Sequence, residues 1–343
     1  MSALHHPPGD PVTVFAPATV GNVACGFDVL GLALEAPGDR VRAWTCPEPG
    51  LRIRSITGDG GQLPRQAHQN TAGLAALAVL DLARERGAQV PGVELDLIKG
   101  LPQAGGMGGS AASAVAGAVA VDSILGLRLP RSILLQCAGR GEAEGAGAAH
   151  LDNAAPALYG GICLVLPPAD SGPPTVVELP VPPGLHVALV NPALRIPTAD
   201  ARAALGDSVP MAAAISQWGN TAGFVAALFR GDMELLARTA LDHVAEPVRA
   251  ALIPGFQRIR AEALRAGALA ASISGAGPSL FALCPDAPTA ANAAQAMVHA
   301  FRGEGVEAEG HVSPVAHRGA HVVTVDPDPS ASGDGPFSET ASR

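Results

Sequence analysis

The chain has 343 residues, which is enough for about two domains, each with its own hydrophobic core. Its formal net charge of −9 and its lack of a basic cluster argue against a nucleic-acid-binding surface. Five scattered cysteines without C-x-x-C spacing exclude a disulfide framework and a zinc site, and no apolar run reaches membrane-spanning length, so we expect a cytoplasmic protein without a membrane partner.

The first half of the chain alternates strand-like and helical patterns. Short apolar or alternating runs predict strands and longer apolar runs predict helices, namely strands at residues 12–15, 93–98 and 160–166 and helices at residues 71–86, 110–125 and from residue 131 onward. Pro17 is expected to break the first strand, because proline has no N–H to donate to a sheet. Proline-rich connections beyond residue 166 place a domain boundary near residue 170.

The second half shows the same mixture of patterns. It predicts strands at residues 186–190, 268–274, 279–284 and 321–325 and helices at residues 198–205, 216–230, 233–241, 256–265 and 289–302. Mixed elements in both halves indicate an α+β architecture, with domains at residues 11–170 and 175–326. The tails at residues 1–10 and 327–343 are expected to be disordered, because they are poor in apolar residues that build a core.

A glycine-rich stretch between residues 99 and 113 joins a predicted strand to a predicted helix. Glycines there let backbone N–H groups approach an anion at the helix N-terminus, so the stretch predicts a phosphate site. A Walker loop requires Gly-Lys-Ser/Thr at its end, whereas the only lysine, Lys99, precedes the glycines. The pattern Gly106-x-Gly108-x-x-Ala111 fits a dinucleotide fingerprint, but the acidic residue expected about 20 residues later is missing. A non-Walker nucleotide loop, a dinucleotide site and a chance turn all remain open at this point.

Three other segments carry candidate chemistry, and each has a plain structural alternative. Asp28 sits in a turn after Asn22 and could bind a cation or cap the turn. Glu142 and Glu144 precede the run His150-x-Asp152-Asn153, and they either bind Mg²⁺ or belong to a solvated loop. The Ser/Gly turn at residues 274–279 is either a hairpin or a second phosphate cradle.

Two arginines complete the candidate set. Arg202 lies four residues after Thr198 on one predicted helix face, and Arg249 lies in a distant segment. Two such guanidinium groups can hold one carboxylate, although either residue can equally be an ordinary surface arginine.

Taken in order, these segments resemble the GHMP kinase superfamily, and within it the homoserine kinase family. The resemblance covers roughly residues 12–325 and rests on Pro17-x-x-x-x-Asn22-x-x-x-Gly26-Phe27-Asp28, Gly108-Gly109-Ser110-Ala111-Ala112-Ser113, His150-x-Asp152-Asn153, Thr198-x-x-x-Arg202, Ala245-Glu246-Pro247-x-Arg249 and Ser274-Gly275-Ala276-Gly277-Pro278-Ser279. It implies a ribosomal protein S5 domain 2-like N-terminal domain, a ferredoxin-like C-terminal domain and a homodimer. It also implies Mg²⁺- and ATP-dependent phosphorylation of the L-homoserine side-chain hydroxyl, a step of threonine biosynthesis.

The resemblance also implies which residues contact ATP. Asn70 would lie by the nucleoside, and the loop around the phosphates would comprise Pro102, Gly105, Gly106, Met107, Gly108, Gly109, Ser110, Ala111 and Ser113. The chain departs from the family's usual Gly-Leu-Gly-Ser-Ser, because Met107 replaces leucine and Gly109 replaces the first serine.

The same resemblance implies the catalytic and substrate residues. Ser110 and Glu142 would hold Mg²⁺, with Glu144 as the alternative glutamate, and Asn153 would lie by the reacting hydroxyl. The remaining substrate contacts would be Asn22 and Asp28 to the amino group, Arg202 and Arg249 to the carboxylate, and Thr198, Ser274, Gly275 and Gly277 around the pocket. The alternatives are another GHMP small-molecule kinase, such as a mevalonate or shikimate kinase, and a binding relative that has lost turnover. Two arginines with an acidic Asp28 favour a zwitterionic amino acid over a hydroxy acid.

Overall fold

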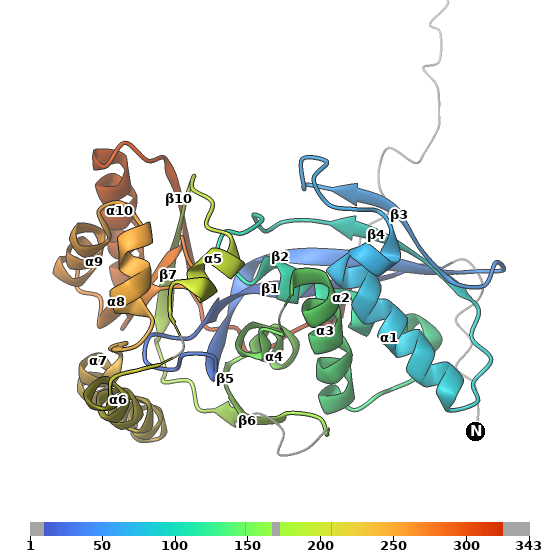
Figure 1. Cartoon of the computed structure of the whole chain (residues 1–343), viewed down its shortest axis with the longest axis horizontal. Coiled ribbons are helices and arrows are strands. Elements are labelled where there is room, and N and C mark those ends of the chain that lie inside the picture. The colour runs from blue at the N-terminus through green and yellow to red at the C-terminus, as the bar shows by residue number, and fades with distance from the viewer. Residues whose placement is uncertain (1–9, 148, 167–171, 207, 325–343) are drawn as a thin grey trace, which may run out of the picture.

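The computed structural model describes residues 10–147, 149–166, 172–206 and 208–324. The predicted domain boundary near residue 170 and the predicted tails, apart from Asp10, lie outside these described residues. The helices and strands form two sheets with helices packed against them, which confirms the predicted α+β class (Figure 1). Within the described residues no helix combines the length and the apolarity needed to cross a membrane.

The first sheet has seven strands and is mostly antiparallel. It contains β1 (Val12–Gly21), β2 (Leu30–Cys46), β3 (Leu51–Thr57), β4 (Gly92–Ile98), β5 (Ile162–Leu166), β6 (Thr175–Leu179) and β11 (His321–Val323). Its main path runs β11-β1-β2-β4-β3, while β5 pairs with β2 and β6 pairs with β5. The prediction that Pro17 breaks the first strand is wrong. The strand continues, and its register with β2 shifts between Pro17 and Thr19, an irregularity of the kind that accommodates a proline in a sheet.

Four helices cover one face of this sheet. They are α1 (Thr71–Glu85), α2 (Gly109–Leu125), α3 (Arg131–Ala146) and α4 (Leu151–Tyr159), and a short 3-10 helix, η1 (Ala67–Gln69), precedes α1 (Figure 1). Helix α2 lies at the centre of this layer and is buried on nearly all sides, as expected for a helix that is apolar all round. Its small residues allow close approach, since a Cβ at Gly117 would lie 2.4 Å from the Ala72 carbonyl oxygen.

The second sheet is antiparallel and has four strands in the order β10-β7-β9-β8. Its elements are β7 (His186–Pro192), α5 (Thr198–Ala203), α6 (Met211–Arg230), α7 (Met233–Thr239), α8 (Glu246–Arg249), η2 (Ala250–Leu252), α9 (Phe256–Arg265), β8 (Ala270–Ile273), β9 (Leu280–Cys284), α10 (Ala287–Gly303) and β10 (Ala308–Pro314). Strand–helix–strand–strand–helix–strand order with this strand arrangement is the ferredoxin-like topology. The predicted fold of the second domain is therefore confirmed.

Helices pack on both faces of the second sheet. Successive side chains of β7 alternate between two cores, because a strand points neighbouring side chains to opposite faces. Val187 and Leu189 join the large core that includes α6 and α7, whereas Ala188 and Val190 join a separate core under α9 and α10. Helix α6 is thus held by its inner face alone, at the edge of the molecule (Figure 1).

Two strands that lie within residues 175–326, the predicted second domain, belong to the first sheet, and only the one near residue 321 was predicted as a strand. Residues 175–179 form β6, which pairs with β5, and residues 321–323 form β11, which pairs with β1. The chain therefore returns to the first sheet at its C-terminal end.

Candidate active site

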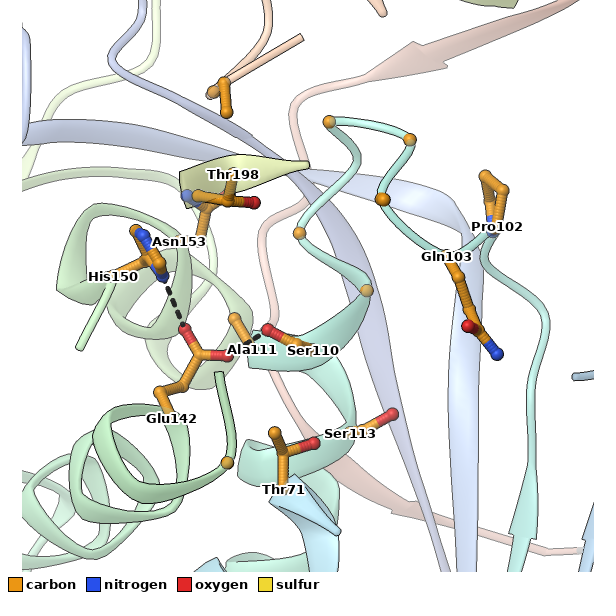
Figure 2. A pocket seen from close by; sticks show the side chains of 18 of the residues that line it. Thr71, Pro102, Gln103, Ser110, Ala111, Ser113, Glu142, His150, Asn153 and Thr198 are labelled. Carbon is orange, nitrogen blue, oxygen red and sulfur yellow. Dashed lines mark hydrogen bonds and ion pairs between the residues drawn. The ribbon is translucent and has the colours of Figure 1, made fainter. Parts of the chain in front are cut away.

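A pocket of about 360 Å³ lies where the two halves meet. Every predicted site residue except Met107 and Ser274 lines it, namely Asn22, Asp28, Asn70, Pro102, Gly105, Gly106, Gly108, Gly109, Ser110, Ala111, Ser113, Glu142, Asn153, Thr198, Arg202, Arg249, Gly275 and Gly277. Figure 2 shows side chains from α2, α3, α4 and α5 converging on this space. Segments far apart in the sequence are thus brought together, as the ordered motifs require.

The glycine-rich loop leads from β4 into the N-terminus of α2. Gly106 and Gly108 have φ values of 75° and 67°, which only glycine adopts without strain. A Cβ at Gly108 would also lie 1.9 Å from the Thr19 hydroxyl oxygen. No side chain caps α2, so its first N–H groups and its positive dipole end are free to meet an anion. Met107 is only 1% exposed and packs in the core, so its side chain does not line the site.

The Ser/Gly turn at residues 274–279 holds the loop from behind. The Ser274 hydroxyl donates to the Gly106 carbonyl, and the Ser279 hydroxyl donates to the Gly105 carbonyl. Asn191 donates a third hydrogen bond to the loop, also to the Gly105 carbonyl, at 3.1 Å. Ser274 is fully buried and its hydroxyl is used to fix the loop, so its predicted place among the substrate residues rests on the loop that it holds.

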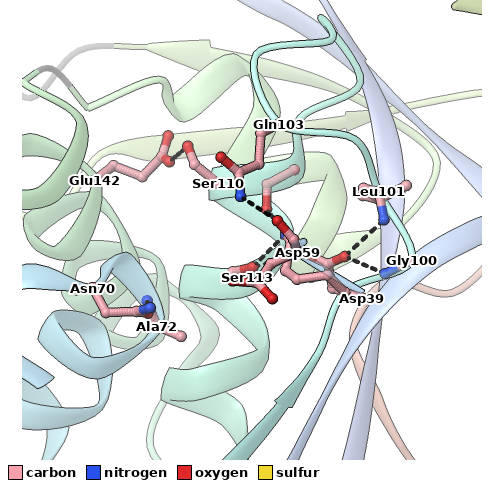
Figure 3. Close-up of polar contacts among 12 residues, drawn as sticks. Asp39, Asp59, Asn70, Ala72, Gly100, Leu101, Gln103, Ser110, Ser113 and Glu142 are labelled. Carbon is pink, nitrogen blue, oxygen red and sulfur yellow. Dashed lines mark hydrogen bonds and ion pairs between the residues drawn. The ribbon is translucent and has the colours of Figure 1, made fainter. Parts of the chain in front are cut away.

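Lys99 folds back beneath the start of α2. Its Nζ forms an ion pair with the buried Asp39 and donates to the Gly109 carbonyl at 3.0 Å and to the Ser113 hydroxyl at 2.8 Å. Asp39 also accepts from the N–H groups of Gly100 and Leu101, at 3.0 and 3.1 Å (Figure 3). The position of Lys99 before the glycines rules out a Walker loop, but the chain reversal still places its cation at the phosphate loop. The Ser113 hydroxyl is directed to Asp39 and Lys99.

A carboxylate lies beside the first turn of α2. The Ser110 hydroxyl donates to Oε1 of Glu142, which α3 presents from a fully buried position (Figure 2). The other oxygen, Oε2, is buried without a hydrogen-bond donor, and the nearest cationic group, His150 Nδ1, lies 3.5 Å away. That distance is too long for a strong hydrogen bond, so Oε2, although it pairs with His150 when the ring is protonated, can still accept a further ligand. The interaction with Glu142 raises the pKa of His150.

Helix α3 separates the two glutamates that the sequence leaves as alternatives. Residues 141–145, interpreted in isolation as a solvated loop, are the last turns of this helix. Glu144 is directed outward, where its carboxylate is 47% exposed and pairs with Arg140. Only Glu142 lines the pocket.

Asn70 has a structural role as the N-cap of α1. Its side-chain oxygen accepts from the N–H groups of Ala72 and Gly73, at 3.0 and 3.5 Å, and its amide donates to the Pro64 carbonyl at 3.0 Å (Figure 3). These bonds use most of the hydrogen-bonding capacity of the side chain. Asn70 lines the pocket, but its principal contacts are to the backbone, and its place by the nucleoside stays a prediction.

The loop after β1 has an unusual backbone. Asn22, Val23 and Ala24 follow one another with φ values of 68°, 38° and 58°, and Asp28 has a φ of 60°. Each non-glycine residue in this region costs roughly 1–3 kcal/mol, and such strain concentrates at ligand sites. The Asn22 side chain stabilises the loop, because it accepts from the Asp28 N–H at 3.0 Å and donates to the Gly275 carbonyl at 2.8 Å.

Phe27 lies between the two predicted arginines. The Arg202 and Arg249 guanidinium carbons lie 5.4 and 5.3 Å from the centre of its ring, within the range of a cation–π contact. Arg202 also forms an ion pair with Asp28 and remains largely exposed. Arg249 is only 4% exposed and donates to the carbonyls of Ala201 and Gly275, at 3.2 and 3.0 Å. Burial lowers the pKa of its guanidinium.

Asp152 is a buried carboxylate on the opposite side of the substrate loop. It is 3% exposed and accepts from the Asn22 N–H at 2.9 Å. Burial, together with the nearby charge of Asp28, raises its pKa to about 6. The neighbouring Asn153 is held by Thr19, whose hydroxyl donates to it at 2.9 Å. No ion pair in the described part of the chain joins a cation to Asp152 or an anion to Arg249.

The pocket therefore contains one buried anion and one buried cation that lack oppositely charged partners among the described residues. Unpaired buried charges are costly unless a ligand pairs with them. A zwitterion that offers a cationic group to Asp152 and an anionic group to Arg249 satisfies both. The glycine loop beside Glu142 suits a second, separate anion, namely a phosphate whose oxygen atoms can also bind a metal ion.

Gln217 is a positioning residue that sequence patterns did not reveal. Its side chain projects from α6, donates to the Cys25 carbonyl at 2.7 Å and accepts from the His243 N–H at 2.7 Å. These bonds join the substrate loop to the segment that leads to Arg249. Its only sequence signal is its spacing of four residues from Thr221, which donates to the same Cys25 carbonyl at 2.7 Å.

Comparisons with known proteins agree with this geometry. The family model "GHMP kinases N terminal domain" matches residues 73–161, and "GHMP kinases C terminal" matches residues 224–303. A homoserine kinase of Chlorobium phaeobacteroides is 42% identical over 320 residues, which is 91% of this chain and 99% of that protein. A homoserine kinase of Xylella fastidiosa is 39% identical over 310 residues, or 90% of this chain and 93% of that protein.

The chain belongs to the homoserine kinase family.

The crystal structure of homoserine kinase from Cytophaga hutchinsonii matches this chain with a TM-score of 0.87 and 42% identity, over 94% of this chain and 100% of that chain. Mevalonate kinase of L. major, solved with R-mevalonate, matches with a TM-score of 0.64 at 16% identity, which shows a shared fold alone. The chain is therefore an ATP-using kinase of the GHMP superfamily with the predicted two-domain fold. The resemblance inferred from the motifs is confirmed.

Proposed function

We propose that this member of the homoserine kinase family transfers the γ-phosphoryl group of ATP to the side-chain hydroxyl of L-homoserine. The observation that carries the substrate assignment is the pair of buried, unpartnered charges, Asp152 and Arg249, in one pocket. L-Homoserine is a zwitterion with a hydroxyl group, and its ammonium and carboxylate groups match these charges. The product, O-phospho-L-homoserine, then serves threonine biosynthesis.

The substrate contacts follow from these charges. Arg249 would form a charge-assisted pair with the substrate carboxylate, and the more exposed Arg202 would close over it from α5. Asp152 and Asp28 would bind the ammonium group, and Asn22 would keep their loop in its strained conformation. Asn153, oriented by Thr19, would contact the reacting hydroxyl.

Phosphoryl transfer in this pocket would proceed by positioning and electrostatics. The hydroxyl oxygen forms a bond to the γ-phosphorus, the bond to the β,γ-bridging oxygen breaks with its electron pair staying on ADP, and the hydroxyl proton passes to a phosphate oxygen or to water. A loose transition state requires little early deprotonation, so direct attack oriented by Asn153 does not depend on a general base. The N-terminus of α2 would stabilise the charge on the phosphates, while Lys99, already paired with Asp39, would hold the loop in place.

Ser110 and Glu142 are the residues that would hold Mg²⁺. Their fit rests on the oxygen atoms present, because Glu142 Oε2 is buried without a donor and the Ser110 hydroxyl lies beside the same carboxylate. Mg²⁺ prefers oxygen ligands and commonly takes one or two from protein, with phosphate and water supplying the rest. When bound, it would neutralise phosphate charge.

A coupled ADP-release assay with ATP and Mg²⁺ tests the proposed reaction. L-Homoserine should support ADP release, with O-phosphohomoserine identified by phosphorus NMR, whereas mevalonate, shikimate and L-serine should not. Binding of ATP and homoserine without turnover would instead indicate a relative that has lost catalysis. In that case Gly109, which stands where the family's loop usually has a serine, is the position to examine. Adding a side chain there would require a small local shift, because a Cβ at Gly109 would lie only 3.2 Å from the Pro102 carbonyl oxygen.

We further propose a cytoplasmic homodimer. Free cysteines and a buried aliphatic core fit a reducing compartment, since all five cysteines are unpaired. The dimer is proposed from the family resemblance, and its interface is considered below.

Replacing Asp152 with asparagine should stabilise the fold while weakening substrate binding. The folded-state pKa of about 6 lies above the ordinary 3.8, so burying the ionised group costs stability above pH 6. A shift of this size corresponds to at most ~3 kcal/mol. The gain in free energy of unfolding should be full at pH 7.5 and shrink as the pH falls from 6 toward 4. Urea unfolding at several pH values measures the gain, and a gain independent of pH would contradict this cause.

Replacing Gln217 with methionine should raise the KM for homoserine about tenfold and leave the KM for ATP unchanged. Methionine keeps the side-chain length but loses both hydrogen bonds, each of which contributes about 0.5–1.5 kcal/mol. Thr221→Ala is the matched control, because it removes a donor to Cys25 and leaves the His243 contact intact. Its effect on KM should be smaller. An equal rise in both KM values would indicate a general loss of structure.

A further inference from the structure

The outer face of α6 carries a continuous apolar stripe. Met211, Ile215, Trp218 and Phe229 are 66%, 58%, 63% and 66% exposed. At 100° per residue these four side chains fall within an arc of about 60°, and they extend over about 27 Å of helix. Scattered exposed apolar residues need no explanation, but a contiguous stripe of this length marks an interaction surface.

The same face carries no charge. Of the 20 residues of α6, only Arg230 at its C-terminal end is ionisable. Ordinary surface helices carry charged residues on the face opposite the core. The inner face of α6 is already occupied, because Gln217 and Thr221 bond to the substrate loop and Phe224 and Leu228 join the core. The outer stripe is therefore the free side of a firmly held helix.

We propose that this stripe is the interface through which two copies of this chain associate. The inference rests on the homodimer proposed above and is independent of the proposed reaction. An uncharged face is self-complementary, since an identical copy brings no like charge against it. A two-fold axis through the middle of the stripe would pack the two helices against each other.

The exposed area suits such a dimer. The four large side chains offer roughly 500 Å² at these exposures, and Val209, 44% exposed at the start of the helix, adds to them. A standard interface buries about 800 Å² per partner, which backbone and neighbouring small residues would supply. Gly219 lies midway along the helix beside the stripe, and a Cβ there would meet no atom within 4 Å, so a partner can approach the backbone at this point.

The oligomeric mass of the full chain tests this interface. Sedimentation equilibrium of the wild type should give the mass of two chains, and Ile215→Glu and Trp218→Glu should each weaken the dimer about 30-fold or more, as expected for central hot spots. Ser216→Glu is the control, because Ser216 is exposed on the same helix but lies off the stripe. It should leave the dimer intact, and circular dichroism should show all three variants folded.

Tryptophan fluorescence gives a second readout of the same surface. The chain has two tryptophans, so Trp44→Phe leaves Trp218 as the single emitter. Its emission should shift to the blue as the protein concentration rises through the dimer Kd. A monomeric wild type would overturn both the dimer and the interface. A dimer that persists in both glutamate variants, or a Trp218 emission wavelength that does not change with protein concentration, would overturn the interface alone. None of these outcomes bears on homoserine turnover.

Discussion

Glu142→Gln should lower kcat by about 10²–10³-fold, the usual effect of removing one preorganised electrostatic group from an active site. Glutamine keeps the shape and an acceptor for Ser110, but it removes the negative charge and the free Oε2 that we assign to Mg²⁺. The Mg²⁺ concentration needed for half-maximal rate should rise, while the KM for homoserine should change little. Steady-state kinetics over a Mg²⁺ titration separate these effects.

Glu144→Gln is the matched control for that experiment. Its carboxylate is half exposed and pairs with Arg140. Glu144 lies two residues after Glu142 on α3, so it projects away from the pocket. It should therefore retain the wild-type rate and Mg²⁺ dependence. If Glu144→Gln proves the more damaging variant, the assignment of the metal ligand is wrong.

Arg249→Ala should raise the KM for homoserine about 10- to 150-fold, which corresponds to the loss of a charge-assisted pair of ~1.5–3 kcal/mol. The guanidinium is buried, so its pairing with a carboxylate is poorly screened by water. Arg202→Ala should have a smaller effect, because Arg202 is largely exposed and already pairs with Asp28.

Initial rates over a range of homoserine concentrations measure both arginine variants. Arg249 also donates to the carbonyls of Ala201 and Gly275, so part of its effect is structural. Arg249→Lys keeps a positive charge and one donor, and it should recover part of the affinity. An unchanged KM in Arg249→Ala would refute the carboxylate clamp.

Local signals in the sequence were sufficient for the phosphate loop. The glycines, the preceding alternating strand and the alanine-rich helix are consecutive in the chain, and the structure places β4 and α2 within one residue of the predictions. The pairing of Asp28 with Arg202 was not predictable in the same way. It depends on how the second domain docks against the first.

Other features required long-range information. Strand β2 contains Pro37 and Gly38, which resemble a turn, yet pairing with β1 and β4 keeps the segment extended for 17 residues. Lys99 precedes the glycines in sequence, and only the reversal of the chain into α2 places it under the loop. The two glutamates became distinguishable once their segment proved helical, since residues two apart on a helix project in nearly opposite directions.

The central claim is that two buried charges select a zwitterionic alcohol. The most direct measurement compares kcat/KM for L-homoserine, for 4-hydroxybutanoate, which lacks the amine, and for 3-aminopropan-1-ol, which lacks the carboxylate. Each analogue leaves Asp152 or Arg249 buried without a partner, so kcat/KM for each should be lower than for L-homoserine by about 10-fold or more. The Arg249→Ala variant should lose its preference for L-homoserine over 3-aminopropan-1-ol and keep its preference over 4-hydroxybutanoate. Comparable kcat/KM values for all three alcohols would contradict the account.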